Sequence, residues 1–217
     1  MRLRGRGGQN GVLRDPKDSV PRVIALGRLS LFGHAATRLH DDVLAVAAAL
    51  PTKGSRLVPF GEDKDRAAIA RLEELFAGSP TLAKVPAKVQ QMLCSQASQH
   101  FLELWPQVEQ EGDAQAHDAE SKLRRRGKLE ADALSKIIRD QMRLAERTLD
   151  QQLAFEFTEA EREQREQRER DRKHIAARRE ALAVEAVEEP KAILASYEVL
   201  RRRVEPIGLV YLWPTTR

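Results

Sequence analysis

The feature that most constrains this chain is a long stretch with the apolar spacing of a helix. Apolar side chains recur there at steps of three or four residues: Leu134, Ile138, Met142, Ala145, Leu149 and Leu153. The pattern stays helical from Asp113 to about Phe155, and at 1.5 Å per residue such a helix would be roughly 60 Å long. A helix of this length must pack along another element or pair as a coiled coil.

A second, strongly charged helix is expected directly after it. Thr158 and Glu161 have the spacing of a capping box, which predicts a helix start. The range Glu159–Lys173 then holds almost only charged residues and glutamine, and apolar residues return from Ile175 onward. We therefore expect a long charged helical hairpin over residues 113–189.

Composition agrees with long helices that carry ion pairs on their exposed faces. Lys and Arg number 37 and Asp and Glu number 33, which gives a net charge of +4. Charged residues make up 32% of the chain, against about 25% in an ordinary domain. The hydrophobic share of 41% is enough for a normal core. A net charge of this size permits nucleic-acid binding but does not demonstrate it.

The two ends of the chain are expected to contain short strands. Val23–Leu26 and Leu29–Leu31 predict two strand pieces, and Ile207–Trp213 predicts a buried closing strand. Pro190 is expected to open a helix that reaches Val204. Apolar spacing and flanking Pro or Gly predict three further helices, over residues 35–50, 63–76 and 86–110.

The expected fold class is therefore mainly α, with long helices in a helical bundle or coiled-coil hairpin and short β-strands near both chain ends. We divide the chain into four parts: a flexible basic segment, an α/β cap with a strand and three helices, the charged hairpin, and a helix with a closing strand. They span residues 1–19, 20–112, 113–189 and 190–217. Pairing between the end strands would clamp the chain into one unit.

The sequence contains no recognisable catalytic or cofactor-binding constellation. The nearest match to a phosphate-binding loop, Lys53-Gly54-Ser55, has the wrong order and lacks the first glycine. His40-Asp41 matches a metal-binding pair of phosphohydrolases, but the other histidines lack ligand-like spacing. We interpret that pair as surface residues of a helix, and Cys94 as a core or boundary residue. We expect no enzyme activity, metal or cofactor.

Cysteine content and hydropathy favour a cytoplasmic protein. The single cysteine, Cys94, excludes an intrachain disulfide and a Cys-rich zinc site, as is usual in a reducing compartment. The longest apolar run, Val43–Leu50, is too short to span a bilayer. The basic N-terminal segment lacks the apolar stretch of a secretory signal. No membrane partner is expected.

Basic clusters are the main functional indication in the sequence. The cleanest cluster contains no acid and comprises Lys122, Arg124, Arg125, Arg126 and Lys128. The second cluster is Arg201, Arg202 and Arg203. Basic side chains bind phosphate backbones by neutralising charge and releasing counterions. The alternative is a solvated helix surface, which the acids interleaved through 161–171 favour.

Two stretches are distinctive enough to indicate a family. They are RVIALGRLSLFG at Arg22–Gly33, followed by Ala36–Leu44, and RVEPIGLVYLWP at Arg203–Pro214. Together with LWPQV at Leu104–Val108, they resemble the C-terminal region of bacterial Swi/Snf-type DNA helicases. The resemblance is closest to the large helicase-like subunit of the DISARM anti-phage system, and it covers most of residues 20–214.

The resemblance implies an accessory module rather than a motor. In such helicases the ATPase lobes lie upstream and carry the nucleotide loop, the acidic metal-binding box and the arginine finger, none of which occurs here. The chain then looks like a separated or truncated C-terminal part. Its expected partners are double-stranded DNA, the motor lobes or other defence-complex subunits. The alternative is a structural coiled-coil module for protein–protein interaction, with self-association through the 134–153 stripe.

Overall fold

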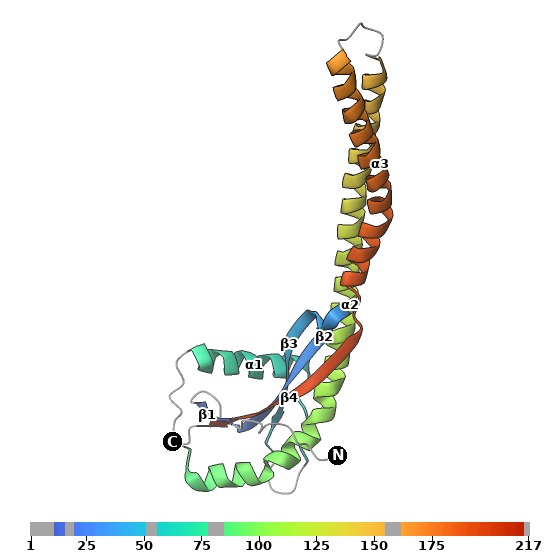
Figure 1. Ribbon diagram of the computed structural model, residues 1–217. Helices are drawn as coiled ribbons and strands as arrows, with labels where there is room; N and C mark the ends of the chain where they lie inside the picture. The colour runs from blue at the N-terminus through green and yellow to red at the C-terminus, as the bar shows by residue number, and fades with distance from the viewer. Residues whose placement is uncertain (1–10, 16–19, 51–55, 78–84, 155–161, 215–217) are drawn as a thin grey trace. The chain divides into compact units, whose positions relative to one another are not determined.

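The computed structural model describes residues 11–15, 20–50, 56–77, 85–154 and 162–214 (Figure 1). Its elements in chain order are β1 (Gly11–Asp15), β2 (Arg22–Phe32), the 3₁₀ turn η1 (His34–Ala36), β3 (Arg38–Ala49), α1 (Glu62–Ala77), α2 (Ala87–Ala154), α3 (Arg162–Ser196) and β4 (Arg201–Pro214). These elements group into two compact units. The first unit holds the four strands, α1 and α2 up to Ala119, and the second holds the rest of α2, α3 and residues 33–37.

The first unit is built on a four-stranded mixed sheet with the order β1-β4-β2-β3. The central strand β2 runs antiparallel to both β3 and β4, and β1 runs parallel to β4. The register places Val23 between Ala48 and Tyr211. β2 has a strand neighbour on each side and, over its first half, a helix on each face, and its residues Val23–Leu26 are all apolar.

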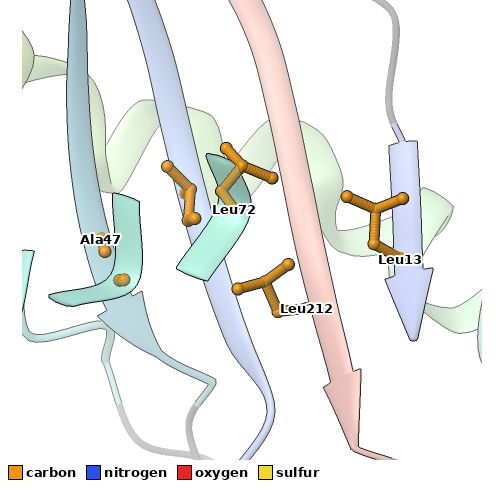
Figure 2. Close-up of a cluster of buried hydrophobic side chains, with 6 residues drawn as sticks. Leu13, Ala47, Leu72 and Leu212 are labelled. Atoms are coloured by element: carbon orange, nitrogen blue, oxygen red, sulfur yellow. The ribbon is translucent and has the colours of Figure 1, made fainter. Parts of the chain in front are cut away.

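One face of the sheet packs against α1. Figure 2 shows this core, in which Leu13, Ala47 and Leu212 come from β1, β3 and β4, and Leu72 comes from α1. Ile24 of β2 completes the sheet side of the cluster and is fully buried. Successive strand residues point to opposite faces, so these side chains mark the face that α1 covers.

The opposite face packs against the first part of α2. A Cβ atom at Gly27 would lie 2.7 Å from Cγ1 of Val108, so glycine permits this close approach of strand and helix. Nδ1 of His100 lies 3.0 Å from the hydroxyl of Tyr211, and both side chains are buried. Burial lowers the pKa of His100 and raises that of Tyr211 to about 12. The phenol therefore stays protonated near neutral pH, and the tautomer of the neutral imidazole decides which of the two groups donates.

The second unit is a helical hairpin in which α2 and α3 lie side by side (Figure 1). A Cβ atom at Gly127 of α2 would lie 2.9 Å from Cδ2 of Tyr197, near the end of α3. Ile138 of α2 and Leu182 of α3 are buried farther along the pair. The sequence predicts that the apolar stripe of this helix needs a partner. Its side chains from Leu134 to Leu149 are buried or half-buried, and α3 of the same chain covers them. The side chain of Leu153 lies outside the described residues.

The expected mainly-α class with short end strands is wrong. The sheet contains strands of 11, 12 and 14 residues, and β3 occupies the range where we expected a helix over 35–50. The continuous apolar run at Val43–Ala49 fits a buried helix and a buried strand equally well by periodicity. Pairing with β2 along the whole strand favours the extended form.

Helix boundaries also differ from expectation at two prolines. The helices expected over 86–110 and from Asp113 are one helix, because α2 continues through Pro106. Pro190 lies inside α3, which ends at Ser196, and the range expected to continue as a helix to Val204 enters β4 instead. The helix over 63–76 is confirmed as α1. Residues 1–10 and 16–19 and the capping-box residue Thr158 lie outside the described residues.

Candidate nucleic-acid interface

The basic cluster on α2 lies in the second unit, and all five of its basic side chains are exposed. Helix geometry makes it one continuous surface, because neighbours on a helix face are three or four residues apart. Lys122 lies beside Arg125 and Arg126, and Lys128 lies beside Arg124 and Arg125. Gly127, which contacts Tyr197 near the end of α3, is buried on the remaining side of the helix.

Arg126 is held in a defined position at the end of the hairpin. Its Nε donates to Oε1 of Glu130 over 2.9 Å, and the Tyr197 hydroxyl donates to Oε2 of the same carboxylate over 2.7 Å. The Arg126 guanidinium also lies 5.8 Å from the centroid of the Tyr197 ring. The hydrogen bonds from Tyr197 and Arg126 lower the pKa of Glu130, so the carboxylate stays charged.

The other members of the cluster differ in how they are paired. Arg124, Arg125 and Lys128 form no ion pair with any residue that the structure describes. Their charges are therefore available to an external anion. Several basic residues of α3 are instead paired with acids of the same helix, as Arg170 is with Glu166 and Lys173 with Glu169.

An open cavity of about 450 Å³ lies between the two helices beside the cluster. Arg124 and Tyr197 line it together with the carboxylates of Glu120 and Glu198. Because the lining carries two acids and one base, the cavity does not favour a phosphate group. The exposed helix surface is the better candidate for phosphate binding.

The second predicted cluster does not act as one group. Successive residues of β4 point to opposite faces of the sheet, so Arg202 is separated from Arg201 and Arg203. Arg202 lies on the face covered by α2 and pairs with Asp113 at 2.8 Å. Arg203 lies on the other face and pairs with Glu205 at 2.7 Å. Only two of the three arginines thus share a surface.

His40 and Asp41 do not form a metal site. They lie on β3 rather than on the expected helix, and successive strand residues face opposite ways. Asp41 accepts hydrogen bonds from Arg28 and from the Ser30 hydroxyl, which hold its pKa well below its usual range. Within the ranges that the structure describes, no group of three or more His, Cys, Asp or Glu side chains could hold a metal ion.

Two further expectations can be compared with the structure. Cys94 is exposed on α2, so its interpretation as a core or boundary residue is wrong. Among the described helices, none combines the length and apolar character needed to cross a membrane.

Sequence analysis missed Arg28 and Arg38 as members of a charged surface. Arg38 falls in the helix expected over residues 35–50, and Arg28 falls on the polar side of a half-buried strand. The available signal was the alternation of Arg28 and Ser30 with Leu29 and Leu31, which already put the polar pair on one face.

Comparison with known proteins gives no match for this chain among protein-family models, curated proteins or solved structures.

Proposed function

We propose that this chain is a non-catalytic module that binds double-stranded DNA through the basic cluster on α2. The observation that carries the proposal is the exposure of five basic side chains within one short stretch of helix. Arg124, Arg125 and Lys128 have no ion-pair partner in the described part of the chain. In keeping with the sequence resemblance, the module serves as an accessory part of a Swi/Snf-like DNA translocase in phage defence. Motor lobes or other defence-complex subunits would be its protein partners.

Binding of this kind depends on the phosphate backbone and not on base sequence. Each phosphate neutralised on duplex DNA contributes about 0.9 to the slope of log affinity against log salt. Three to five contacts predict a loss of affinity of about 40- to 500-fold between 50 and 200 mM salt. Arg126 would contribute less than its neighbours, because a phosphate must compete there with Glu130.

Fluorescence anisotropy on a labelled duplex tests the proposal. The test variant replaces Arg124, Arg125 and Lys128 with alanine. The matched control replaces Arg170, Lys173 and Arg178, which have the same total charge but are paired with acids of α3. We expect the test variant to lose most of the salt-dependent affinity and the control to retain it. Equal losses in both variants would show only an effect of net charge and would contradict the proposal.

A structural protein–protein interaction module is the second candidate function. It is favoured by Leu129, Ile137 and Leu144, which are 64%, 54% and 65% exposed along α2. At 3.6 residues per turn they fall within an arc of about 80°, so they lie on one side of the helix, where an amphipathic partner helix could pack. Light scattering over a range of protein concentrations tests whether a second copy is that partner. A monomer at every concentration would exclude self-association.

A further inference from the structure

Part of the sheet face that carries α1 is left uncovered by the helix. The α1 core uses Ile24 and Leu26 of β2, and the next residues on that face are Arg28, Ser30 and Phe32. The strand register gives each of them two lateral neighbours. Arg28 lies between Val43 and Glu205, Ser30 between Asp41 and Arg203, and Phe32 between Arg38 and Arg201.

This uncovered area has an excess of positive charge, and we call it the arginine face. Its charged residues are Arg28, Arg38, Asp41, Arg201, Arg203 and Glu205. Four arginines and two acids give it a net charge of 4 − 2 = +2. The side chains of Arg28, Arg38 and Arg203 are 40%, 48% and 59% exposed. The face is therefore open to a ligand in solution.

Asp41 organises one side of the arginine face. Its Oδ1 accepts from Nε of Arg28 over 2.8 Å, and its Oδ2 accepts from Nη1 of Arg38 over 3.2 Å. The buried Ser30 hydroxyl also donates to Oδ1 over 2.8 Å. One carboxylate thus fixes two guanidinium groups, and both remain exposed.

The other side of the arginine face provides an aromatic ring, and its arginines have fewer ion pairs. The Arg38 guanidinium lies 5.8 Å from the centroid of the Phe32 ring. Arg201 lies next to Phe32 in the register and forms no ion pair with a residue that the structure describes. Among the described residues, Arg203 is paired only with Glu205, on its own strand. Planar groups for stacking and cations for phosphates therefore occur together.

We propose that the arginine face binds single-stranded nucleic acid, with one base stacked on the Phe32–Arg38 layer and phosphates bound by Arg201 and Arg203. Stacking requires an unpaired base, because the faces of paired bases are already covered within a duplex. Three strands about 4.8 Å apart give a surface roughly 10 Å wide, which suits two or three nucleotides. This site goes beyond the proposed duplex-binding function, because it uses another unit and another form of ligand.

The test is anisotropy of the full chain on a labelled oligothymidylate of about twelve nucleotides, across 50–200 mM salt. R201A and R202A remove the same charge from the same triplet, on opposite faces of the sheet. We expect R201A to reduce the salt slope by about 0.7, the value for one phosphate contact on a single strand. R202A should leave that slope unchanged. Equal slopes for R201A and R202A would overturn the proposal.

Replacement of Phe32 tests the stacking contact separately. F32L should weaken binding by about 5- to 150-fold, the range for loss of one stacked base, whereas F32Y retains a ring and should bind like the natural chain. Comparison of both variants by circular dichroism guards against a folding defect in F32L. Equal affinities of F32L, F32Y and the natural chain would overturn the stacking role.

The α2 variant separates this inference from the proposed function. The chain with Arg124, Arg125 and Lys128 replaced by alanine should keep its affinity for the oligothymidylate while losing affinity for duplex DNA. Duplex binding without single-strand binding by the natural chain would overturn the inference and leave the proposed function standing. Single-strand binding without duplex binding would overturn the proposed function and leave this inference standing.

Discussion

The hydroxyl of Tyr197 donates a hydrogen bond of 2.7 Å to Glu130, although 67 residues separate the two in the chain. The contact joins the end of α3 to the segment of α2 that carries the basic cluster. Glu130 in turn accepts a hydrogen bond from Arg126, and the Tyr197 ring lies against Gly127. The position of α3 and the arrangement of the cluster are thereby coupled within the hairpin.

Gly127→Ala should destabilise the hairpin. The added Cβ would lie 2.9–3.1 Å from three atoms of Tyr197, including its Cβ, which cannot move without the backbone. Overpacking of this kind costs about 1–3 kcal/mol, which over nearly all of that range exceeds the roughly 1 kcal/mol by which alanine favours a helix over glycine. Circular dichroism during urea unfolding measures the effect.

The double variant Gly127→Ala with Tyr197→Ala gives the decisive comparison. Without the ring, only the helix preference of alanine remains, so Gly127→Ala should stabilise the Tyr197→Ala background. The same sign of effect in both backgrounds would contradict the proposed contact.

The buried pair His100–Tyr211 predicts a stability that depends on pH. Burial holds the pKa of His100 below its ordinary value of 6.5, so the unfolded chain binds this proton more tightly than the folded chain. The contribution is fully present above about pH 6.5 and declines as pH falls through the lower folded value. His100→Gln should lose this decline and show a flatter profile between pH 7 and 5.

Tyr211 should produce the opposite trend in alkaline solution. Its pKa rises from 10 to about 12 in the folded chain, so the stability it contributes is complete below pH 10 and is lost as pH rises toward 12. Tyr211→Phe should remove that part of the alkaline decline. Tryptophan fluorescence suits both measurements, because Trp105 and Trp213 belong to the unit that contains the pair. A natural-chain profile as flat as that of the variants would contradict the assignment.

Gly27→Ala should destabilise the first unit, because its Cβ would lie 2.7 Å from Cγ1 of fully buried Val108. We expect a loss of about 1–3 kcal/mol in the free energy of unfolding. In the Val108→Ala background the space is free, and the same change should cost much less. Urea unfolding followed by tryptophan fluorescence checks both values, and additive effects of the two substitutions would show that they do not meet.

The long helix was predictable because its apolar period repeats through Leu134, Ile138 and Met142 without interruption. The strand β3 was not predictable, because Val43–Ala49 is apolar at every position and carries no period of its own. Its identity depends on hydrogen bonds to β2, which are contacts between distant parts of a sequence. Local patterns therefore identified the hairpin and the strand segments within β2 and β4, whose expected pairing is confirmed, but not β3 or the extent of the sheet.

The two candidate sites differ in the same way: local sequence shows one of them, and the other depends on contacts between distant strands. The cluster on α2 was found because its charges are adjacent in sequence and all exposed on one helix. The arginine face joins Arg28, Arg38 and Arg203 from three strands, so it appears only once the register is known. The sequence predicts Arg201–Arg203 as one group because the triplet falls in the helix expected to reach Val204. In β4, strand alternation puts Arg202 on the opposite face.

Asp41→Asn should strengthen binding of the oligothymidylate by the arginine face. The natural carboxylate stays ionised, because Arg28 and Ser30 hold its pKa well below the usual range, and it repels phosphate. Arg38 would remain over the Phe32 ring, so the gain of one positive charge should outweigh the loss of its hydrogen bond to Asp41. Anisotropy across 50–200 mM salt measures the change in affinity.

Asp42→Asn is the matched control, because Asp42 is the next residue of β3 and faces the other side of the sheet. It changes the net charge by the same amount as Asp41→Asn but should leave single-strand affinity almost unchanged. If the two variants bind equally tightly, net charge alone accounts for the effect. In that case the position of Asp41 on the arginine face has no specific effect on binding, which would contradict the proposed single-strand site.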